Sequence, residues 1–328
     1  MVISGMRAIR YHEHGEADVL TLEEIDEPSP RGNEVLIDIA AIGINHVDTL
    51  FREGIFTPPG LPAIPGSDAA GTVVEVGEQV TGYDTGDRVV CASLGGDRPG
   101  TYAEMTTAPV DRVAQLPDAV DFASAAGMGH VGTAAWQAVI HHGGLRPGET
   151  CLIHGGGGGL GHIAVQLAAL TGGTVITTEA DEATRERLAD IGADAVFDYR
   201  RDDLEEAILS VGQPNLIVDY HFDNYTEFDI ENIAHDGRVS ILEYTTETDG
   251  RAQIPQSTLR AGILKDVTLQ LIGIFNADVS AVLGRLAKLV ANDDLHIEIA
   301  DTYSLEEAPQ AQHDIVEESI FGKLVIKV

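Results

Sequence analysis

One turn of the chain carries a clear chemical signature, because its glycines are spaced to bind a dinucleotide. Gly156, Gly158 and Gly161 follow the pattern Gly-x-Gly-x-x-Gly. Backbone without side chains lets a pyrophosphate approach, and the helix that follows supplies free N–H groups and a partial positive charge. We therefore expect the turn, including Gly159 and Leu160, to hold the phosphates of a nicotinamide cofactor. The alternative is a flexible glycine-rich loop with no ligand.

An acidic residue stands where such a turn needs one. The apolar segment 174–178 reads as a strand, and Glu179 ends it. In dinucleotide-binding units an Asp or Glu about 20 residues beyond the glycines accepts hydrogen bonds from the ribose hydroxyls. Glu179 is therefore the predicted ribose contact, and its charge disfavours the 2′-phosphate of NADP(H).

These residues need a sheet to position them. From about residue 127 to 270 the sequence alternates between short apolar segments and helical ones, which predicts βαβ units in an α/β fold. The predicted strands span 150–154, 174–178, 195–198, 215–219, 238–242 and 268–273, and the helices include 159–171, 182–191 and 203–210. The sequence thus predicts a doubly wound parallel sheet whose strand ends carry the glycine turn.

The two flanking segments differ from this middle block. Residues 1 to about 125 are rich in short strands between Gly and Pro turns, among them 35–41, 71–77 and 87–90. The tail contains predicted helices over 278–291 and 305–320 and a final strand over 323–328. Because the tail is too short for a core of its own, we expect it to pack onto the N-terminal block. The predicted domains are 1–126, 127–270 and 271–328, the last returning to the first.

Composition limits the partners and the compartment. The 328 residues include 53 Asp and Glu against 20 Lys and Arg, a net charge of −33, and the acids are spread along the chain. Such a surface repels nucleic acid and anionic membranes, and we interpret it as halophilic adaptation to a salt-rich cytoplasm. Two cysteines cannot build a disulfide framework, and no apolar run is long enough for a signal peptide or a membrane helix. We therefore expect a soluble cytoplasmic protein.

Ordered motifs along nearly the whole chain resemble one family. Besides the glycine turn they lie at 43–49, 52–54, 65–71, 86–89, 100–104, 198–200, 237–238 and 322–325. This pattern resembles the zinc-independent quinone oxidoreductase branch of the medium-chain dehydrogenase/reductase superfamily. The resemblance implies a GroES-like β-rich catalytic domain and a Rossmann domain, with the active site in the cleft between them.

The resemblance also bears on metal binding. Zinc-dependent members of the superfamily have Cys in the position of Asn45, a His-Glu pair in the position of Ser67 and Asp68, and a further Cys near Gly129. Asn, Ser and Gly do not replace thiolate or imidazole ligands, so we expect no zinc. The alternative is a new metal site built from residues that flank these positions, namely His46, Asp68 and His130.

Without a metal, hydride transfer suits a substrate that can carry negative charge, such as a quinone or an enone. By the resemblance, Asn45 contacts the substrate carbonyl or the nicotinamide, Asp48 holds the loop around it, and Thr133 lies near the nicotinamide. His130 is a candidate proton donor, and Phe275 is expected to line the pocket beside the cofactor. The alternatives are that Asn45 only caps a turn and that Thr133 only caps a helix that begins there.

Two sets of residues favour different cofactors. Glu179 favours NAD(H), whereas Tyr199 and Arg200 match a pair that binds the 2′-phosphate in some relatives. We expect NAD(P)(H) binding with a preference for NAD(H). The turns at 219–223 and 243–244 carry bulky residues where relatives have small ones, which indicates a reshaped cleft or a lower cofactor affinity.

The predicted activity is metal-free transfer of hydride from NAD(P)H to a quinone or an α,β-unsaturated carbonyl. The predicted edge strand 268–273 is apolar, and in relatives this edge pairs with its twin, so we expect a homodimer. Two alternatives remain at this point: a zinc-independent alcohol or polyol dehydrogenase, and a non-enzymatic NAD(P)-binding sensor.

Overall fold

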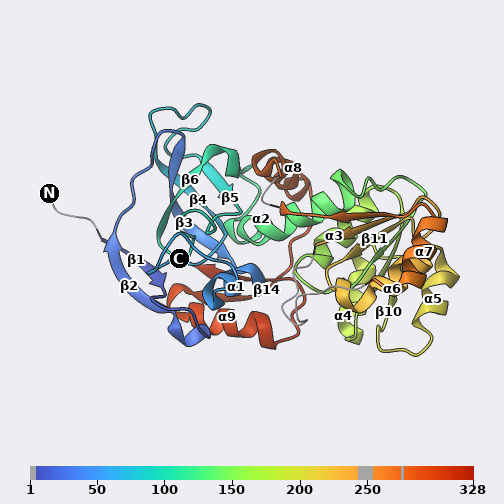
Figure 1. The fold of residues 1–328 in the computed structure, drawn as a ribbon. Helices are drawn as coiled ribbons and strands as arrows, with labels where there is room; N and C mark the ends of the chain where they lie inside the picture. Colours follow the sequence, from blue (N-terminus) through green and yellow to red (C-terminus); the bar gives the residue numbers. More distant parts are fainter. Residues whose placement is uncertain (1–4, 243–253, 275–276) are drawn as a thin grey trace. The chain divides into compact units, whose positions relative to one another are not determined.

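The structure, a computed structural model, describes residues 5–242, 254–274 and 277–328 (Figure 1). The chain forms two compact units. Unit 1 contains Met1–Thr133 and Phe275–Val328, and unit 2 contains Ala134–Ile274. Phe275 and the turn at 243–244, both singled out from the sequence, lie outside the described residues.

Unit 1 is built on a seven-stranded sheet that is mostly antiparallel. The strand order is β14-β15-β3-β4-β5-β7, and β6 pairs with β3. The strands are β3 (Glu34–Gly43), β4 (Asp68–Val76), β5 (Arg88–Cys91), β6 (Met105–Pro109), β7 (Val113–Gln115), β14 (Ile299–Ser304) and β15 (Lys323–Lys327). Strand β15 pairs antiparallel with β3, with Val325 opposite Gly43, so the tail of the chain returns to the sheet of the N-terminal block.

The remaining elements of unit 1 surround this sheet. A separate antiparallel pair consists of β1 (Gly5–Arg10) and β2 (Thr21–Asp26). The helices are α1 (His46–Glu53), α2 (Phe122–Trp136), α8 (Val279–Ala291) and α9 (Ala308–Glu317). Helix α1 begins at the cap residue Asn45 and ends at Gly54, whose φ of 83° is a left-handed conformation that favours glycine. Helix α2 begins at Phe122, so the interpretation of Thr133 as the cap of a new helix was wrong.

Unit 2 contains a parallel sheet of six strands. Their order is β10-β9-β8-β11-β12-β13, and every neighbouring pair is parallel. The strands are β8 (Thr150–Ile153), β9 (Thr174–Thr178), β10 (Ala195–Phe197), β11 (Leu216–Asp219), β12 (Arg238–Ile241) and β13 (Thr268–Leu271). Counted from β8, the order is 3-2-1-4-5-6, which is the doubly wound arrangement of dinucleotide-binding domains. The predicted α/β fold class is therefore confirmed.

The helices of unit 2 connect these strands. They are α3 (Gly161–Leu170), α4 (Glu182–Asp190), α5 (Leu204–Val211), α6 (Phe222–Asn232) and α7 (Gln256–Leu264). The core of the unit gathers the β-branched and Leu side chains of the strands, including Leu152, Ile176, Ile217 and Val239. In the described part of the chain, no helix combines the length and the apolar character needed to cross a bilayer.

Candidate active site and dinucleotide-binding turn

A cluster of polar side chains is buried in unit 1, where β3 and β4 approach β15. Asn45, Asp48, Ser67, Asp68 and Lys323 are each no more than 3% exposed. The cluster thus holds two carboxyl groups and one amine away from water. Burying ionisable groups costs free energy unless they are hydrogen-bonded. Hydrogen bonds link the five residues to one another, and Asp68 Oδ1 alone among their side-chain oxygens and nitrogens has no described partner.

Local backbone geometry positions the first two residues of this cluster. Asn45 follows the end of β3 and caps α1, and its backbone N–H donates to Asp48 Oδ2 at 3.0 Å. Asp48 thereby closes a capping box with Asn45. Ser67 Oγ donates to Asp48 Oδ1 at 2.8 Å, and the Tyr102 hydroxyl donates to Oδ2 at 3.3 Å. Asp48 is therefore the residue that holds the loop together.

The orientation of the Asn45 amide is determined by its neighbours. Lys323 Nζ donates to Asn45 Oδ1 at 2.7 Å and also donates to the Ile44 carbonyl. On the other side, Asn45 Nδ2 donates to Asp68 Oδ2 at 2.9 Å and to Ser67 Oγ at 3.2 Å. The ammonium thus faces the amide oxygen, and the acid faces the amide nitrogen.

Burial shifts the pKa values of the charged groups in this cluster. Burial raises the pKa of Asp48 to about 7 and that of Asp68 to about 6, although the Lys323 ammonium opposes the shift at Asp68. Burial lowers the pKa of Lys323 to about 8, against the attraction of both acids. Burial also lowers the pKa of His130 to about 3, so its imidazole is neutral near pH 7. His130 is thus a hydrogen-bonding group rather than a source of an acidic proton at that pH.

The positions of the zinc ligands of related enzymes come together around Asp68. Its Oδ2 accepts from the Asn45 amide and from the backbone N–H of His130 at 2.7 Å. On the helix, Gly129 lies directly against the carboxyl group, because a Cβ at that position would be 2.6 Å from Asp68 Cγ. Thr133 is buried one turn later, where its hydroxyl donates to the Gly129 carbonyl at 2.8 Å.

Sequence reasoning missed Lys323 as a site residue. It was noticed only as part of the motif at 322–325. Its partner Asn45 is 278 positions away, and only the pairing of β15 with β3 brings the two together. The available signal was a lysine at the start of an apolar predicted strand, which does not indicate its partner.

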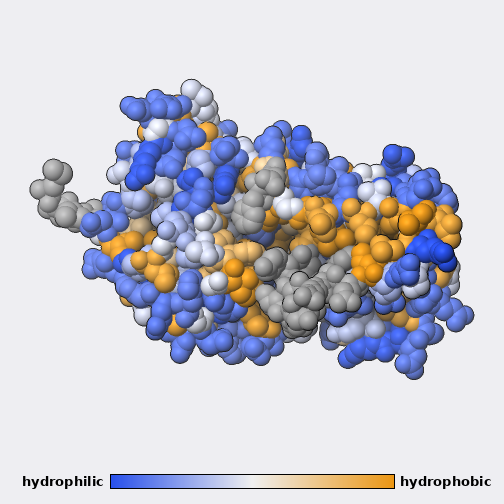
Figure 2. Space-filling view, in the orientation of Figure 1, coloured by the Kyte–Doolittle hydropathy of each residue, from blue (hydrophilic) through white to orange (hydrophobic). Residues whose placement is uncertain are grey.

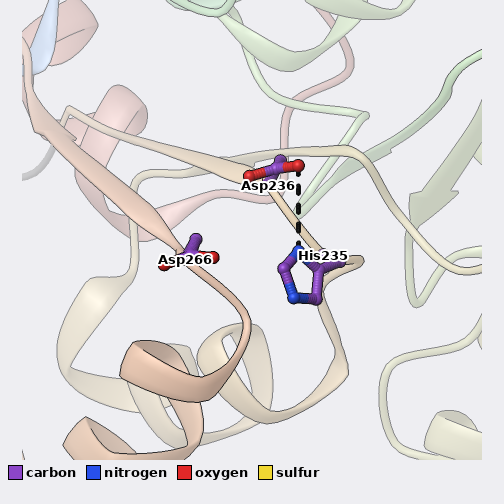
Figure 3. A group of neighbouring side chains, drawn as sticks. All are labelled: His235, Asp236 and Asp266. Carbon is purple, nitrogen blue, oxygen red and sulfur yellow. Dashed lines mark ion pairs between the residues drawn. The ribbon is translucent and has the colours of Figure 1, made fainter.

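The imidazole nitrogens proposed for a new metal site do not form a ligand group with Asp68 among the described residues, although the backbone N–H of His130 donates to Asp68. Within the described ranges, His46, Asp68 and His130 do not form a group whose ligand atoms all lie within 4.8 Å of one another. A group that meets this criterion lies in unit 2, where His235, Asp236 and Asp266 precede β12 and β13 (Figure 3). All three side chains are exposed, and such exposed acidic groups are common on protein surfaces.

The glycine turn of unit 2 lies between β8 and α3 and is packed against β9. Gly156 N–H donates to the Thr178 carbonyl at 3.0 Å. A Cβ on Gly161 would collide with the Gly155 carbonyl, so this position requires glycine for close packing. By contrast, a Cβ on Gly158 would meet nothing closer than 3.6 Å. Gly159 and Leu160 complete the turn, and Leu160 is the cap residue of α3.

Glu179 lies beside this turn, as its position in the sequence predicts. A Cβ on Gly157 would collide with Glu179 Oε2, and Oε1 accepts from the backbone N–H of Asp181 at 3.0 Å. Arg200 is exposed and engages Asp198 through two hydrogen bonds, Nε to Oδ1 at 2.9 Å and Nη2 to Oδ2 at 2.7 Å. The guanidinium of Arg200 is therefore already paired with an acid.

A second arginine, Arg185, reaches the same place. Arg185 Nη1 and Arg200 Nη2 both donate to the Ala180 carbonyl, at 2.6 Å and 3.0 Å. Tyr199 is exposed beside Arg200. One carboxylate and two guanidinium groups thus lie near the end of β9. The carboxylate suits the ribose hydroxyls of NAD(H), and the guanidinium groups suit the 2′-phosphate of NADP(H).

Comparison with known proteins agrees with this architecture. Residues 31–118 match the family described as alcohol dehydrogenase GroES-like domain, and residues 191–326 match the family described as zinc-binding dehydrogenase. The chain is 31% identical to a quinone oxidoreductase of Mus musculus over 98% of this chain and 97% of that protein. The β-rich part of unit 1 is thereby confirmed as GroES-like.

Solved structures give the same result. A quinone oxidoreductase from Coxiella burnetii matches with a TM-score of 0.86 at 30% identity, covering 99% of this chain and all of that one. An Escherichia coli quinone oxidoreductase complexed with NADPH matches with a TM-score of 0.88 at 25% identity, covering 98% of this chain and 100% of that one. The chain belongs to the quinone oxidoreductase branch of the medium-chain dehydrogenase/reductase superfamily.

Proposed function

We propose that this protein transfers hydride from NAD(P)H to a quinone or another α,β-unsaturated carbonyl compound. The observation that carries the proposal is the glycine turn at the carboxyl end of β8 in a doubly wound sheet, in a chain similar to quinone oxidoreductases from end to end. Hydride adds two electrons and one proton to the quinone, and a second proton taken up from water completes the hydroquinone. When bound, the reduced nicotinamide supplies the hydride.

The two units correspond, in this proposal, to the predicted domains. The predicted dinucleotide-binding domain, 127–270, approximates unit 2, which begins at Ala134 and ends at Ile274, and the predicted catalytic domain, 1–126 with 271–328, approximates unit 1. Gly156, Gly158, Gly159, Leu160 and Gly161 hold the cofactor phosphates at the start of α3, where free N–H groups favour anions.

On the catalytic side, Asn45, Asp48 and His130 form the polar wall of the substrate site, and Lys323 is added to them. Hydride addition places negative charge on a conjugated oxygen, and fixed dipoles and cations stabilise such charge. Thr133 and Phe275 are assigned to the nicotinamide.

The proposed chemistry needs no zinc. The donor set around Asp68 lacks thiolate and imidazole ligands in the positions of Asn45, Ser67 and Gly129. Moreover, the Lys323 ammonium already lies against Asn45 Oδ1 at 2.7 Å, where it repels a divalent cation. The lysine therefore supplies the fixed positive charge of this cluster.

NADH is the preferred cofactor in this proposal. Glu179 lies against the glycine turn, and its charge disfavours a 2′-phosphate, whereas Arg200 is engaged by Asp198. The kinetics of NADH and NADPH oxidation test the assignment. We expect Glu179→Gln to raise kcat/KM for NADPH by about tenfold with little effect on NADH. A faster reaction with NADPH that is lost in Arg200→Ala would reverse the preference.

The proposed assembly is a homodimer formed by a second copy at the edge of the parallel sheet. Strand β13 ends the sheet, and Leu271 is 82% exposed there. Ile263 and Leu264 of the neighbouring α7 are 75% and 72% exposed. Figure 2 shows apolar residues gathered over this part of unit 2. An exposed apolar edge strand is normally covered, and a symmetric pairing covers both copies at once. Sedimentation equilibrium should give twice the chain mass, and Leu271→Lys should give monomers.

The activity is tested with the purified protein, NADH or NADPH and a 1,4-quinone, with and without a metal chelator. We expect the cofactor absorbance to fall at the same rate in both cases. Activity that is lost on chelation and restored by added zinc would contradict the metal-free proposal. Cofactor binding without turnover of any quinone or enone would contradict the enzymatic one.

A further inference from the structure

Three ionisable side chains are buried beneath the glycine turn of unit 2 and have no place in the chemistry described so far. His154 directly precedes Gly155 in the turn, Asp219 ends β11, and Asp229 lies on α6. Each of the three is fully buried. Burying two acids and one imidazole costs free energy unless hydrogen bonds or opposite charges compensate the loss of hydration.

The imidazole is held on several sides. His154 Nε2 lies 2.8 Å from Asp229 Oδ1, and its ring stacks on Tyr225 with centroids 4.0 Å apart and an interplanar angle of 5°. Phe228 contacts the same ring edge-on at 5.9 Å. The ring therefore has one orientation, with Nε2 directed at α6.

One oxygen of each carboxyl group has no described hydrogen-bond donor. A proton shared by the two groups would supply that donor. Asp219 Oδ1 accepts from the backbone N–H of His221 at 2.7 Å, but Oδ2 of Asp219 and Oδ2 of Asp229 receive no hydrogen bond from any described donor. The two carboxyl groups lie within hydrogen-bonding reach of each other. Like charges this close disfavour double ionisation, so one proton held between them satisfies both groups.

The cluster joins the two strand ends between which the sheet order reverses. In doubly wound sheets the ligand crevice lies at the carboxyl ends of these two strands, here β8 and β11. Next to Asp219, the hydroxyl of Tyr220 donates to the carbonyl of Gly155. The glycine turn is thus held in two ways: His154 contacts Asp229 on α6, and Tyr220, which follows β11, donates to the Gly155 carbonyl.

We propose that His154, Asp219 and Asp229 are positioning residues of the dinucleotide site, and that one proton shared by the two carboxyl groups holds the glycine turn in its binding geometry. This inference rests on the cofactor-binding part of the proposed function. Loss of the proton places a second negative charge beneath the turn, which loosens the ties and repels the cofactor pyrophosphate. Cofactor affinity then falls as pH rises.

The pH range follows from the environment of the acids. Burial raises the pKa of both acids, and the charge of Asp229 raises that of Asp219 further, so the proton that the two acids share stays bound into the neutral pH range. Burial lowers the pKa of His154 to about 4. The imidazole is therefore neutral in the range where the acids exchange their proton.

Other ionisable side chains surround the cluster. Burial lowers the pKa of His221, and burial raises the pKa values of Tyr220 and Tyr225. Glu179 faces Tyr220 from β9, and Tyr199 faces Tyr225. NADH is the suitable probe because it lacks the 2′-phosphate of NADPH, which titrates near pH 6.

The experiment is a fluorescence titration of NADH binding to the whole protein between about pH 6 and pH 9. We expect the Kd of the wild type to rise by about tenfold over this range, the size of an ordinary coupling free energy. Asp229→Asn carries a permanent donor in place of the shared proton, so its Kd should stay nearly constant. The matched control is Glu227→Gln, an exposed acid on the same helix, which should keep the wild-type profile.

Three results would overturn the inference. A flat wild-type profile would do so without any variant, and so would an Asp229→Asn profile parallel to that of the wild type. Absence of NADH binding at every pH would overturn both this inference and the cofactor assignment, whereas binding with an unaltered pH profile would overturn this inference alone. If Asp229→Asn does not fold, Asp219→Asn takes its place.

Discussion

The two units bury the same kind of group and neutralise it in different ways. In unit 1, Asp48 and Asp68 share their surroundings with the ammonium of Lys323. In unit 2, Asp219 and Asp229 have a neutral imidazole beside them, and no lysine or arginine is among the main causes of their pKa shifts. A lysine provides a charge that persists through neutral pH, whereas a proton exchanges with solvent. Burial raises the pKa values of the acids in both units, but in unit 1 the Lys323 ammonium opposes the shift, whereas in unit 2 the charge of Asp229 adds to the shift of Asp219.

Removal of the cation should have the largest effect. Lys323→Met removes the ammonium that opposes the pKa shifts of Asp48 and Asp68 and breaks its hydrogen bonds to Asn45 and Ile44, so we expect the free energy of unfolding to fall by about 3–5 kcal/mol, the typical cost of leaving buried charge without its partner. Denaturant unfolding measures the loss. Lys327→Met, an exposed lysine on the same strand, is the control and should change stability little. A loss as small as that of the control would show that Lys323 does not stabilise the acids.

The next prediction separates the catalytic use of the unit 1 cluster from its structural use. Asn45→Ser keeps a side chain that caps α1 but removes the amide between Lys323 and Asp68. We expect kcat to fall by about 10²-fold, as for the loss of an aligned dipole, with little change in the KM for NADH. Asp278→Ser changes the cap of α8 and should leave kcat unaltered. An active Asn45→Ser enzyme would reduce Asn45 to a capping residue.

Stability should also respond to pH through the shared proton of unit 2. In the folded protein, burial keeps the proton shared by Asp219 and Asp229 bound into the neutral pH range, whereas unfolded carboxyl groups lose their protons near pH 4. The folded state thus binds one more proton than the unfolded state between about pH 4 and neutral pH, so the stabilisation contributed by this pair is greatest below about pH 4 and falls as pH rises.

Calorimetry of the wild type and of Asp229→Asn tests this pH dependence. The variant should show a shallower decline, by up to about 1.4 kcal/mol per pH unit for one proton. Asp48 and Asp68 contribute a decline of the same sign, which remains in the variant. Identical slopes in the two proteins would mean that the acids of unit 2 do not bind a proton on folding.

The smallest effect is expected from loss of the hydrogen bond between Tyr220 and the glycine turn. Tyr220→Phe removes the hydrogen bond to Gly155, which is worth about 1 kcal/mol, so the Kd for NADH should rise by roughly fivefold at every pH. Tyr83→Phe removes a hydroxyl that donates to a carbonyl in unit 1 and is the matched control. An unchanged Kd in Tyr220→Phe would mean that this hydrogen bond does not hold the glycine turn in its binding geometry, and that the buried cluster alone does so.

The fold of unit 2 was largely predictable because its signals are local. Short apolar runs between glycines placed all six parallel strands within two residues of their observed ends, from β8 (Thr150–Ile153) to β13 (Thr268–Leu271). In unit 1 the same reasoning located β3, β4, β5 and β15 and the helices α8 and α9. It did not predict α1 as a helix, because its eight residues are too few to show a clear period.

The site was predictable only in part. The glycine turn and Glu179 follow from spacing along the chain, and the structure places them side by side. Lys323 and Asp229 were not predicted, because their partners Asn45 and His154 lie 278 and 75 positions away. A window of the sequence shows such residues as an ordinary lysine in a strand and an ordinary acid in a helix.

The sequence by itself therefore determined the doubly wound sheet, the turn at its switch point and the family, because backbone preferences and hydrophobic periodicity act over short distances. Only the tertiary structure decided which acids are buried together and what neutralises them. That choice depends on distance in space and on exclusion of water, neither of which the order of residues specifies. The same residue type, aspartate, consequently has one role beside Lys323 and another beside His154.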